Sequence, residues 1–217
     1  MERAHTETAP VWVRRRGDVI TAAIGFVVLA LGMVAVRNGT VTAPEESAFR
    51  AVNDLPGALY PVMWPWQQLG TLVFAPLVAV VALVLRRYRL AAAIVVAIVA
   101  KLALERVVKT LVTRERPGTS IGLDIETRGD VSVRGESFVS GHALLITALA
   151  GLVAPYLPGR WKIAPWCVAA GLLIGRVYVG AHNPLDVVCG AALGIVIASC
   201  LNLAFGVPAE RRASQTS

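Results

Sequence analysis

Six long apolar runs alternate with short polar segments along the chain. They cover residues 19–36, 58–85, 90–112, 138–156, 163–179 and 184–205, and the second run is interrupted by Pro65 and Pro76. At ~1.5 Å per residue, a helix over each run can cross a hydrocarbon layer about 30 Å thick, with some fraying at its ends. Lipid offers the backbone no hydrogen-bond partner, so a spanning segment satisfies its own peptide groups as a helix. The pattern therefore predicts six transmembrane helices.

The composition strengthens this prediction. Hydrophobic residues make up 56% of the 217 residues and charged residues only 16%, whereas a water-soluble domain is about 45–50% apolar. We therefore expect an all-α fold, a polytopic membrane protein with six helices in a bundle. The net charge of +7 comes mostly from arginines in the tails and between the apolar runs. There it sets orientation and attracts anionic lipid, so no nucleic-acid partner is expected.

Clusters of arginine and lysine predict the orientation of the chain. They occur in both tails and in alternate loops, at Arg14–Arg16, at Arg86, Arg87 and Arg89, at Arg160 and Lys162, and at Arg211 and Arg212. Because positively charged loops stay on the cytoplasmic side, we expect a plasma-membrane protein with both termini in the cytoplasm. The predicted organisation is a basic tail (1–17), a membrane domain (18–207) and a second tail (208–217).

Two of the outer loops have distinctive sequences. The first loop is acidic, and residues 44–55 mix apolar and charged positions, as in a short helix at the membrane surface. The third loop, residues 113–137, breaks the rule that outer loops contain few arginines, because it holds Arg114, Arg116, Arg128 and Arg134. An anionic ligand is one cause of such an exception.

Three polar clusters fall on the outer side of this topology. They are KTLVTRERP at the end of the third run, SFVSGH at the start of the fourth, and GRVYVGAHNPLD between the fifth and the sixth. Two of the three histidines, His142 and His182, lie in these clusters, and the third, His5, lies in the tail. The alternating topology is expected to bring the clusters together.

Several of these side chains are suited to holding a phosphate group. Lys109, Arg116 and Arg176 are three cations, and an arginine can hold two phosphate oxygens with its planar guanidinium. Free backbone N–H groups at a helix start favour an anion beside Ser140 and Gly141, and glycine allows the anion to approach closely.

The two histidines and an aspartate add reactive groups. His182 and Asp186 are four residues apart, and Pro184 suits a first helical turn, so both side chains should point the same way. A carboxylate on one ring nitrogen fixes the tautomer and leaves the other nitrogen as a nucleophile. His142 is then free to serve as a general acid. Cations, donors, nucleophile and acid together describe phosphoryl transfer.

In order and spacing, these residues resemble the motifs of the type-2 phosphatidic acid phosphatase superfamily, the lipid phosphate phosphatases. The family pattern is K-x6-R-P, then P-S-G-H, then S-R-x5-H-x3-D. The first block matches completely, the second has Val139 in place of proline, and the third has Gly175 in place of serine. The motifs span residues 109–186, and the plan of six helices extends the resemblance to nearly the whole chain.

The resemblance implies a bacterial membrane hydrolase that cleaves lipid phosphates or diphosphates at the outer face, with no metal or cofactor. His182 would form a phosphohistidine, Asp186 would orient it, and His142 would protonate the leaving alcohol. The phosphate would be held by Lys109, Arg116, Ser140, Gly141 and Arg176. The expected substrates are of the phosphatidic acid, phosphatidylglycerol phosphate or polyprenyl pyrophosphate type, including undecaprenyl pyrophosphate.

Two further charges lie deeper in the third apolar run. Lys101 and Glu105 are four residues apart, with Lys109 one turn further, and charges at such depth usually face a protein interior or water. They form either a polar wall that contacts the lipid headgroup or a neutralised pair that holds two helices together. Gln67 and Gln68 are expected to form hydrogen bonds between helices rather than to bind a ligand.

Two other functions fit the same sequence. A phosphotransferase uses the same site with a second alcohol in place of water. Six helices also suit a small membrane transporter, but transporters commonly carry repeats and broken helices near the midplane, whereas these polar clusters lie at helix ends. The sequence leaves the oligomeric state open.

Overall fold

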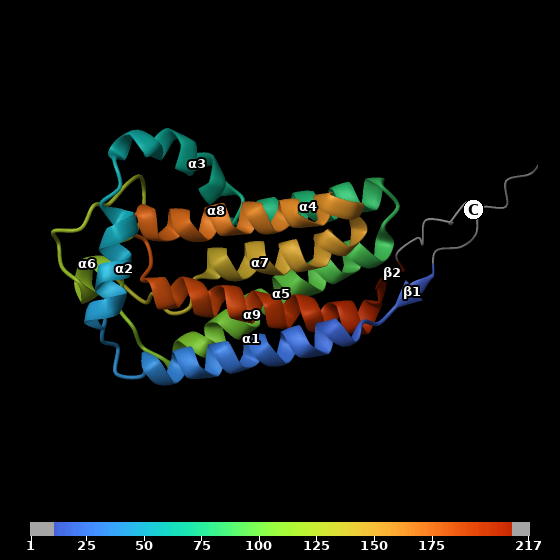
Figure 1. Ribbon diagram of the computed structural model, residues 1–217, viewed down its shortest axis with the longest axis horizontal. Coiled ribbons are helices and arrows are strands. Elements are labelled where there is room, and N and C mark those ends of the chain that lie inside the picture. The colour runs from blue at the N-terminus through green and yellow to red at the C-terminus, as the bar shows by residue number, and fades with distance from the viewer. Residues whose placement is uncertain (1–10, 210–217) are drawn as a thin grey trace, which may run out of the picture.

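The computed structural model describes residues 11–209 as an elongated bundle of helices (Figure 1). The predicted features at His5, Arg211 and Arg212 lie outside the described residues. In chain order the elements are β1 (Trp12–Val13), α1 (Arg16–Ala35), α2 (Ala43–Asn53), η1 (Gly57–Leu59), α3 (Tyr60–Gln68), α4 (Phe74–Val84), α5 (Tyr88–Leu111), α6 (Pro117–Ser120), α7 (Gly141–Val153), η2 (Ala154–Tyr156), η3 (Gly159–Ile163), α8 (Ala164–Tyr178), α9 (Pro184–Phe205) and β2 (Val207–Pro208).

All six predicted runs are helical, but the second is not one helix. Residues 58–85 are divided between α3 and α4 by a break at residues 69–73, so the prediction of a single span there was wrong. Neither proline makes the break, because Pro65 lies inside α3 and Pro76 lies in the first turn of α4. The break contains Gly70, where an added Cβ would lie 2.8 Å from Leu172 and 2.9 Å from His142. Close packing of this turn against α7 and α8 redirects the chain.

Two helices, α1 and α9, are long and apolar enough to cross a membrane. Much of the apolar surface of the bundle faces outward, as at Ile24, Phe26 and Leu31 of α1, which are exposed. Contiguous apolar surface of this kind marks contact with lipid or with another protein.

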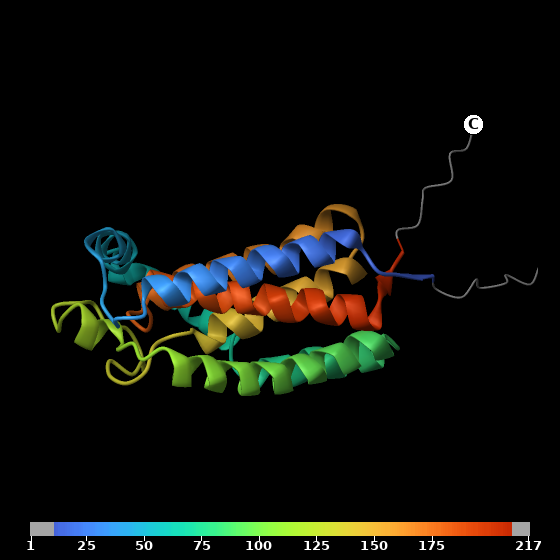
Figure 2. The ribbon, with the colours of Figure 1, turned by 90° about the horizontal axis from the view of Figure 1, so that it is seen from below.

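The centre of the bundle is α7, which packs against α5, α8 and α9. It lies between α8 and α9 in Figure 1, and in Figure 2 α1 and α5 form opposite edges of the bundle. Every residue from Ala143 to Ala150 is buried, so α7 is apolar on all sides, as expected of a core helix.

Close packing of α9 on α7 depends on two glycines one turn apart. A Cβ added to Gly190 would lie 2.5 Å from the carbonyl oxygen of Ser140, and one added to Gly194 would clash with the carbonyl oxygen of Leu144. Residues four apart share a helix face, and small residues there allow two backbones to approach closely. This contact fixes the start of α7 against the start of α9.

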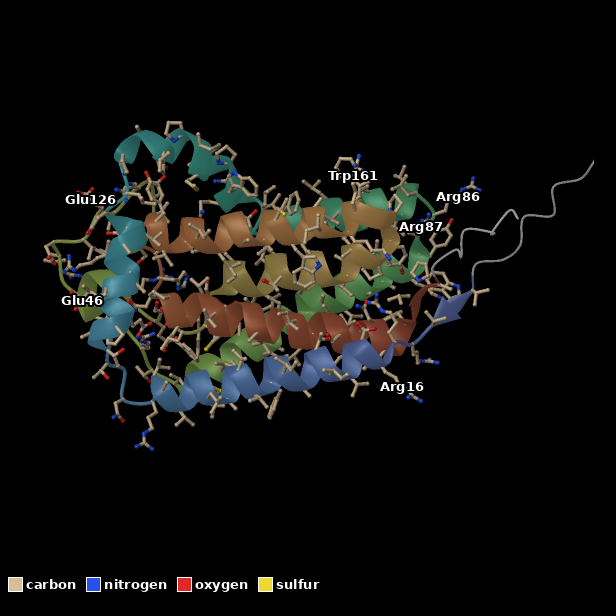
Figure 3. The ribbon with its side chains drawn as sticks, in the orientation of Figure 1. Arg16, Glu46, Arg86, Arg87, Glu126 and Trp161 are labelled. Atoms are coloured by element: carbon tan, nitrogen blue, oxygen red, sulfur yellow. The ribbon has the colours of Figure 1, made fainter. Side chains whose placement is uncertain are left out.

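Within residues 11–209, the basic clusters gather at one end of the bundle, as their occurrence in alternate loops predicts. Arg14 Nε donates to the carbonyl of Leu203 (2.7 Å) and Arg89 Nη1 to that of Phe205 (2.8 Å), so both bind the end of α9. Figure 3 shows Arg16, Arg86 and Arg87 at this end and Glu46 and Glu126 at the opposite end.

The predicted short helix at residues 44–55 is α2, which crosses the opposite end of the bundle (Figure 1).

We predict that Gly194→Ala destabilises the protein while Gly17→Ala does not. The new methyl group at position 194 meets backbone rather than a flexible side chain, and such overpacking costs about 1–3 kcal/mol. Gly17 is also helical but has no neighbour within 4 Å of an added Cβ. Thermal unfolding midpoints of the detergent-purified variants measure both effects. Equal midpoints would contradict the close contact between α7 and α9.

Candidate active site

The third polar cluster, GRVYVGAHNPLD, contacts both of the other clusters. The contacts lie at the end of the bundle opposite Arg16, Arg86 and Arg87 (Figure 3). Arg116 Nη1 donates to the carbonyl oxygen of Ala181 at 2.8 Å, which joins the first cluster to the third. The backbone N–H of Ser140 donates to the carbonyl of Asp186 at 3.0 Å, which joins the second to the third. The expectation that distant parts of the sequence meet at one end of the bundle is confirmed by these contacts.

The start of α7 points into this region. Ser140 is the N-cap of the helix, and its hydroxyl oxygen accepts from the backbone N–H of Ala143 at 3.5 Å. Ser140 itself is fully buried. A helix start carries unpaired N–H groups and a partial positive charge, so this position favours an anion.

Glu105 joins two lysines beside the start of α7. Its carboxylate lies 2.7 Å from Lys101 Nζ and 2.9 Å from Lys109 Nζ. A Cβ added to Gly141 would lie 2.6 Å from Glu105 Oε2, so the carboxylate rests on that glycine. All three charged residues belong to α5, so their ion pairs form within one helix and not between two.

A shallow groove of about 340 Å³ opens along α5 beside these charges. It is lined by Leu102, Glu105, Arg106, Lys109, Thr110 and Glu136.

His182 is buried in the loop between α8 and α9, among cations. Burial lowers the pKa of its imidazole well below the ordinary value, and the charges of Arg176, Arg116, His142 and Lys109 act in the same direction. The ring is therefore neutral at neutral pH and keeps a nitrogen lone pair that can attack.

The expected direct hydrogen bond between His182 and Asp186 is absent, because their nearest side-chain atoms, Nδ1 and Oδ2, are 3.9 Å apart. The hydroxyl of Ser137 lies between them: it donates to Asp186 Oδ2 and is 3.3 Å from His182 Nδ1. A carboxylate only accepts, so the hydroxyl proton goes to Asp186 and the hydroxyl oxygen accepts from Nδ1–H. This arrangement leaves the lone pair on Nε2. Sequence reasoning assigned no role to Ser137, although it is the first residue of the SFVSGH cluster, because it lies outside the P-S-G-H block of the family pattern.

Asp186 is held from its other side by Arg114. Arg114 Nη1 lies 2.9 Å from Asp186 Oδ1 and 3.0 Å from Glu45 Oε1 of α2, and Arg114 is 1% exposed. The backbone N–H of Asn183 donates to Asp186 Oδ2 at 2.9 Å, as in a helix cap. The carboxylate is thus directed toward the cap and Ser137, which explains its separation from the imidazole.

An anionic ligand, one cause considered for the arginines of the third loop, does not account for Arg114 and Arg128, because both bind groups of the protein. Arg128 Nη1 donates to the carbonyls of Tyr178 (2.7 Å) and Asn53 (2.8 Å), and its guanidinium lies 4.2 Å from the centre of the Tyr178 ring. These two arginines bind protein groups and fasten the loop to α2 and α8.

Arg176 is positioned by a residue of α3. Its Nη1 donates to Gln67 Oε1 at 3.1 Å, and both side chains belong to residues that are 8% exposed. The prediction that Gln67 forms hydrogen bonds between helices is confirmed.

His142 lies in the first turn of α7, where Gly70 packs against its Cβ and ring. Within residues 11–209, no three His, Cys, Asp or Glu side chains are grouped so that they could hold a metal ion.

Known proteins share both the sequence and the fold of this region. The family model described as the PAP2 superfamily matches residues 90–207. Lipid A 1-phosphatases of Rhizobium etli and Rhizobium johnstonii are each 42% identical over 59 residues, which is 27% of this chain. The match spans only about a quarter of the length of these relatives, 25% and 24% respectively.

Two solved structures share the architecture at 22% sequence identity. LpxE of Aquifex aeolicus has a TM-score of 0.68, and the match covers 74% of this chain and 95% of LpxE. A PAP2-type phosphatidylglycerolphosphate phosphatase of Bacillus subtilis also has a TM-score of 0.68, with 84% and 94% covered. The family model covers more than half of the chain and includes all three polar clusters. The chain therefore belongs to the PAP2 superfamily.

Proposed function

We propose that this protein is a membrane phosphatase that releases phosphate from a lipid phosphate through a phosphohistidine at His182, without a metal ion. The observation that carries the proposal is the buried, neutral imidazole of His182. Its Nδ1 lies beside the Ser137 hydroxyl that binds Asp186, and the charges of Arg116 and Arg176 surround it. This environment suits a nitrogen nucleophile next to an anionic substrate.

The phosphate lies among Lys109, Arg116 and Arg176, with the Ser140–Gly141 end of α7 as a further donor. Phosphoryl transfer depends mainly on positioning and on stabilising charge on the phosphoryl oxygens. Guanidinium and ammonium groups supply that charge, and a guanidinium can bind two phosphoryl oxygens at once.

The reaction has two steps. First, His182 Nε2 attacks phosphorus, a P–N bond forms as the P–O bond to the lipid breaks, and His142 gives the leaving oxygen its proton. Then His142 takes a proton from water, whose oxygen attacks phosphorus, the P–N bond breaks, and His182 and inorganic phosphate are released. One group acts as acid and then as base, as balanced proton transfer requires. With an alcohol in place of water, the same site is a phosphotransferase.

The membrane location is supported by the apolar outer surface and by the apolar length of α1 and α9. In our proposal six helical segments lie in the bilayer, both termini face the cytoplasm, and the site opens at the outer face of the plasma membrane. The site at the helix ends matches the depth of lipid phosphates, which also argues against the transporter alternative.

The substrate is a lipid phosphate monoester. The relatives are named for lipid A and phosphatidylglycerolphosphate, which supports this class over a polyprenyl diphosphate. The placement of Glu105 supports it as well. Its carboxylate rests on Gly141, next to the proposed acid His142, and so borders the leaving group. In this proposal Lys101 and Glu105 contact the headgroup, and Glu105 repels a leaving group that is itself a phosphate.

We predict that the purified protein releases phosphate from lipid phosphates in EDTA, and that His182→Asn and His142→Asn each lower kcat at least about a hundredfold. After acid-free quenching, 32P from labelled substrate should remain on His142→Asn but not on His182→Asn, because only the latter lacks the nucleophile. Labelled His182→Asn would refute the assignment. Thermal midpoints near that of the wild type control for folding.

We predict that Ser137→Ala lowers kcat about tenfold, because one hydrogen bond that orients the nucleophile is lost. Ser132→Ala is the matched control, since its hydroxyl binds the Arg134 carbonyl in the exposed part of the same loop. Steady-state kinetics of both variants measure the difference. If Ser137→Ala is as active as Ser132→Ala, the link between Asp186 and His182 does not serve catalysis.

We predict that Glu105→Gln raises kcat/KM for a lipid diphosphate relative to the monophosphate about tenfold, because a repulsive charge next to the leaving group is removed. Glu136→Gln makes the same change at an exposed position of the same groove and should leave the ratio unchanged. A ratio that is equal in the two variants would contradict the proposed role of Glu105.

A further inference from the structure

Within residues 11–209, four buried side-chain atoms have no hydrogen-bond partner: Gln67 Nε2, Arg114 Nε, Arg176 Nε and Asn183 Oδ1. Two of them, Gln67 Nε2 and Arg176 Nε, belong to side chains that are bonded to each other. Unpaired buried donors are costly and rare in proteins. A pair of such donors in a cation-rich site indicates a missing acceptor.

The identity of the free atom follows from the bond that Gln67 makes. A guanidinium has only donors, so the atom that accepts from Arg176 Nη1 must be the amide oxygen of Gln67. The atom left without a partner is therefore the NH2 group, which has two protons to donate. At 8% exposure the residue is shielded from water.

The Gln67 amide occupies the space that a side chain at position 175 would take. A Cβ added to Gly175 would clash with Gln67 Nε2. A side chain at this position would therefore displace the amide from its place beside Arg176. Gly175 is also the position where the family pattern has a serine, so a carboxamide from α3 stands where a hydroxyl from α8 is otherwise expected.

The neighbouring residue, Arg176, acts electrostatically on the proposed nucleophile. Its charge is the largest electrostatic influence on the imidazole of His182. Gln67 binds Arg176 with its Oε1 and has a free donor on Nε2. Its amide is therefore placed to bind the same anion as Arg176.

We infer that Gln67 is a phosphate-binding residue. Its Oε1 accepts from Arg176, and its Nε2 donates to a phosphoryl oxygen of the substrate. The inference rests on the proposed phosphatase function and adds to it a donor from a helix that carries none of the family motifs. Gln67 replaces the donor that is absent at position 175.

The decisive variant is Gln67→Glu, which keeps the size of the side chain and the acceptor for Arg176 but replaces the NH2 donor with an anionic oxygen. If Gln67 only packed or only held Arg176, this change would preserve activity. If Gln67 binds the phosphate, the substitution removes a donor and adds a repulsive charge. It should then raise KM for the lipid phosphate and the inhibition constant of orthovanadate at least about tenfold. Gln68→Glu, at the exposed neighbouring position, is the matched control and should change neither value.

A second pair of variants tests the placement of the amide. Gly175→Ser alone should lower kcat/KM, because its Cβ meets Gln67 Nε2, and Gln67→Ala alone should lower it by removing the donor. Gln67→Ala combined with Gly175→Ser makes room for the hydroxyl and should recover activity above both single variants.

The measurements are made on the full chain purified in detergent. The inference would be overturned if Gln67→Glu had the same KM and the same vanadate inhibition constant as Gln68→Glu. It would also be overturned if the double variant folded but its kcat/KM stayed as low as that of the single variants. A wild-type protein that releases no phosphate from any lipid and is not inhibited by vanadate would instead refute the proposed function itself.

Discussion

A buried arginine between two carboxylates determines how the site is assembled. Arg114 is 1% exposed and binds both Glu45 of α2 and Asp186 of α9. A guanidinium removed from water needs charged partners, and deleting one partner of a buried pair costs about 3–5 kcal/mol. The third loop, α2 and α9 therefore adopt the arrangement that brings both carboxylates to Arg114. In that arrangement Asp186 also reaches Ser137, and the hydroxyl of Ser137 lies beside His182.

The distribution of charge around this cluster supports the proposed attack of His182 on phosphorus. The positive charge of Arg114 offsets the negative charge of Asp186. Arg116 and Arg176, by contrast, act on the imidazole of His182 as cations. Burial and these charges keep the ring neutral, and the same charges attract an anionic substrate. The bundle maintains this geometry because Gly190 allows the start of α9 to pack directly on Ser140, at the start of α7.

Much of the fold and the meeting of the three polar clusters could be predicted from sequence, because both depend on local patterns. Apolar runs predicted the helices, and motif spacing indicated the three clusters. The break between α3 and α4 was not predictable, since it depends on how Gly70 packs against distant residues. The contacts of Ser137 with His182 and of Gln67 with Arg176 were not predictable for a related reason: an isolated serine or glutamine has no pattern, and only the folded chain shows which motif residue lies beside it.

The central claim is that one phosphoryl group binds between Nε2 of His182 and the surrounding cations. A structure of the protein with orthovanadate, which adopts the five-coordinate geometry of phosphoryl transfer, tests it most directly. Our account predicts vanadium bonded to Nε2 of His182, with its oxygens bound by Lys109, Arg116 and Arg176. Vanadium bonded to His142, or bound away from His182, would contradict the account.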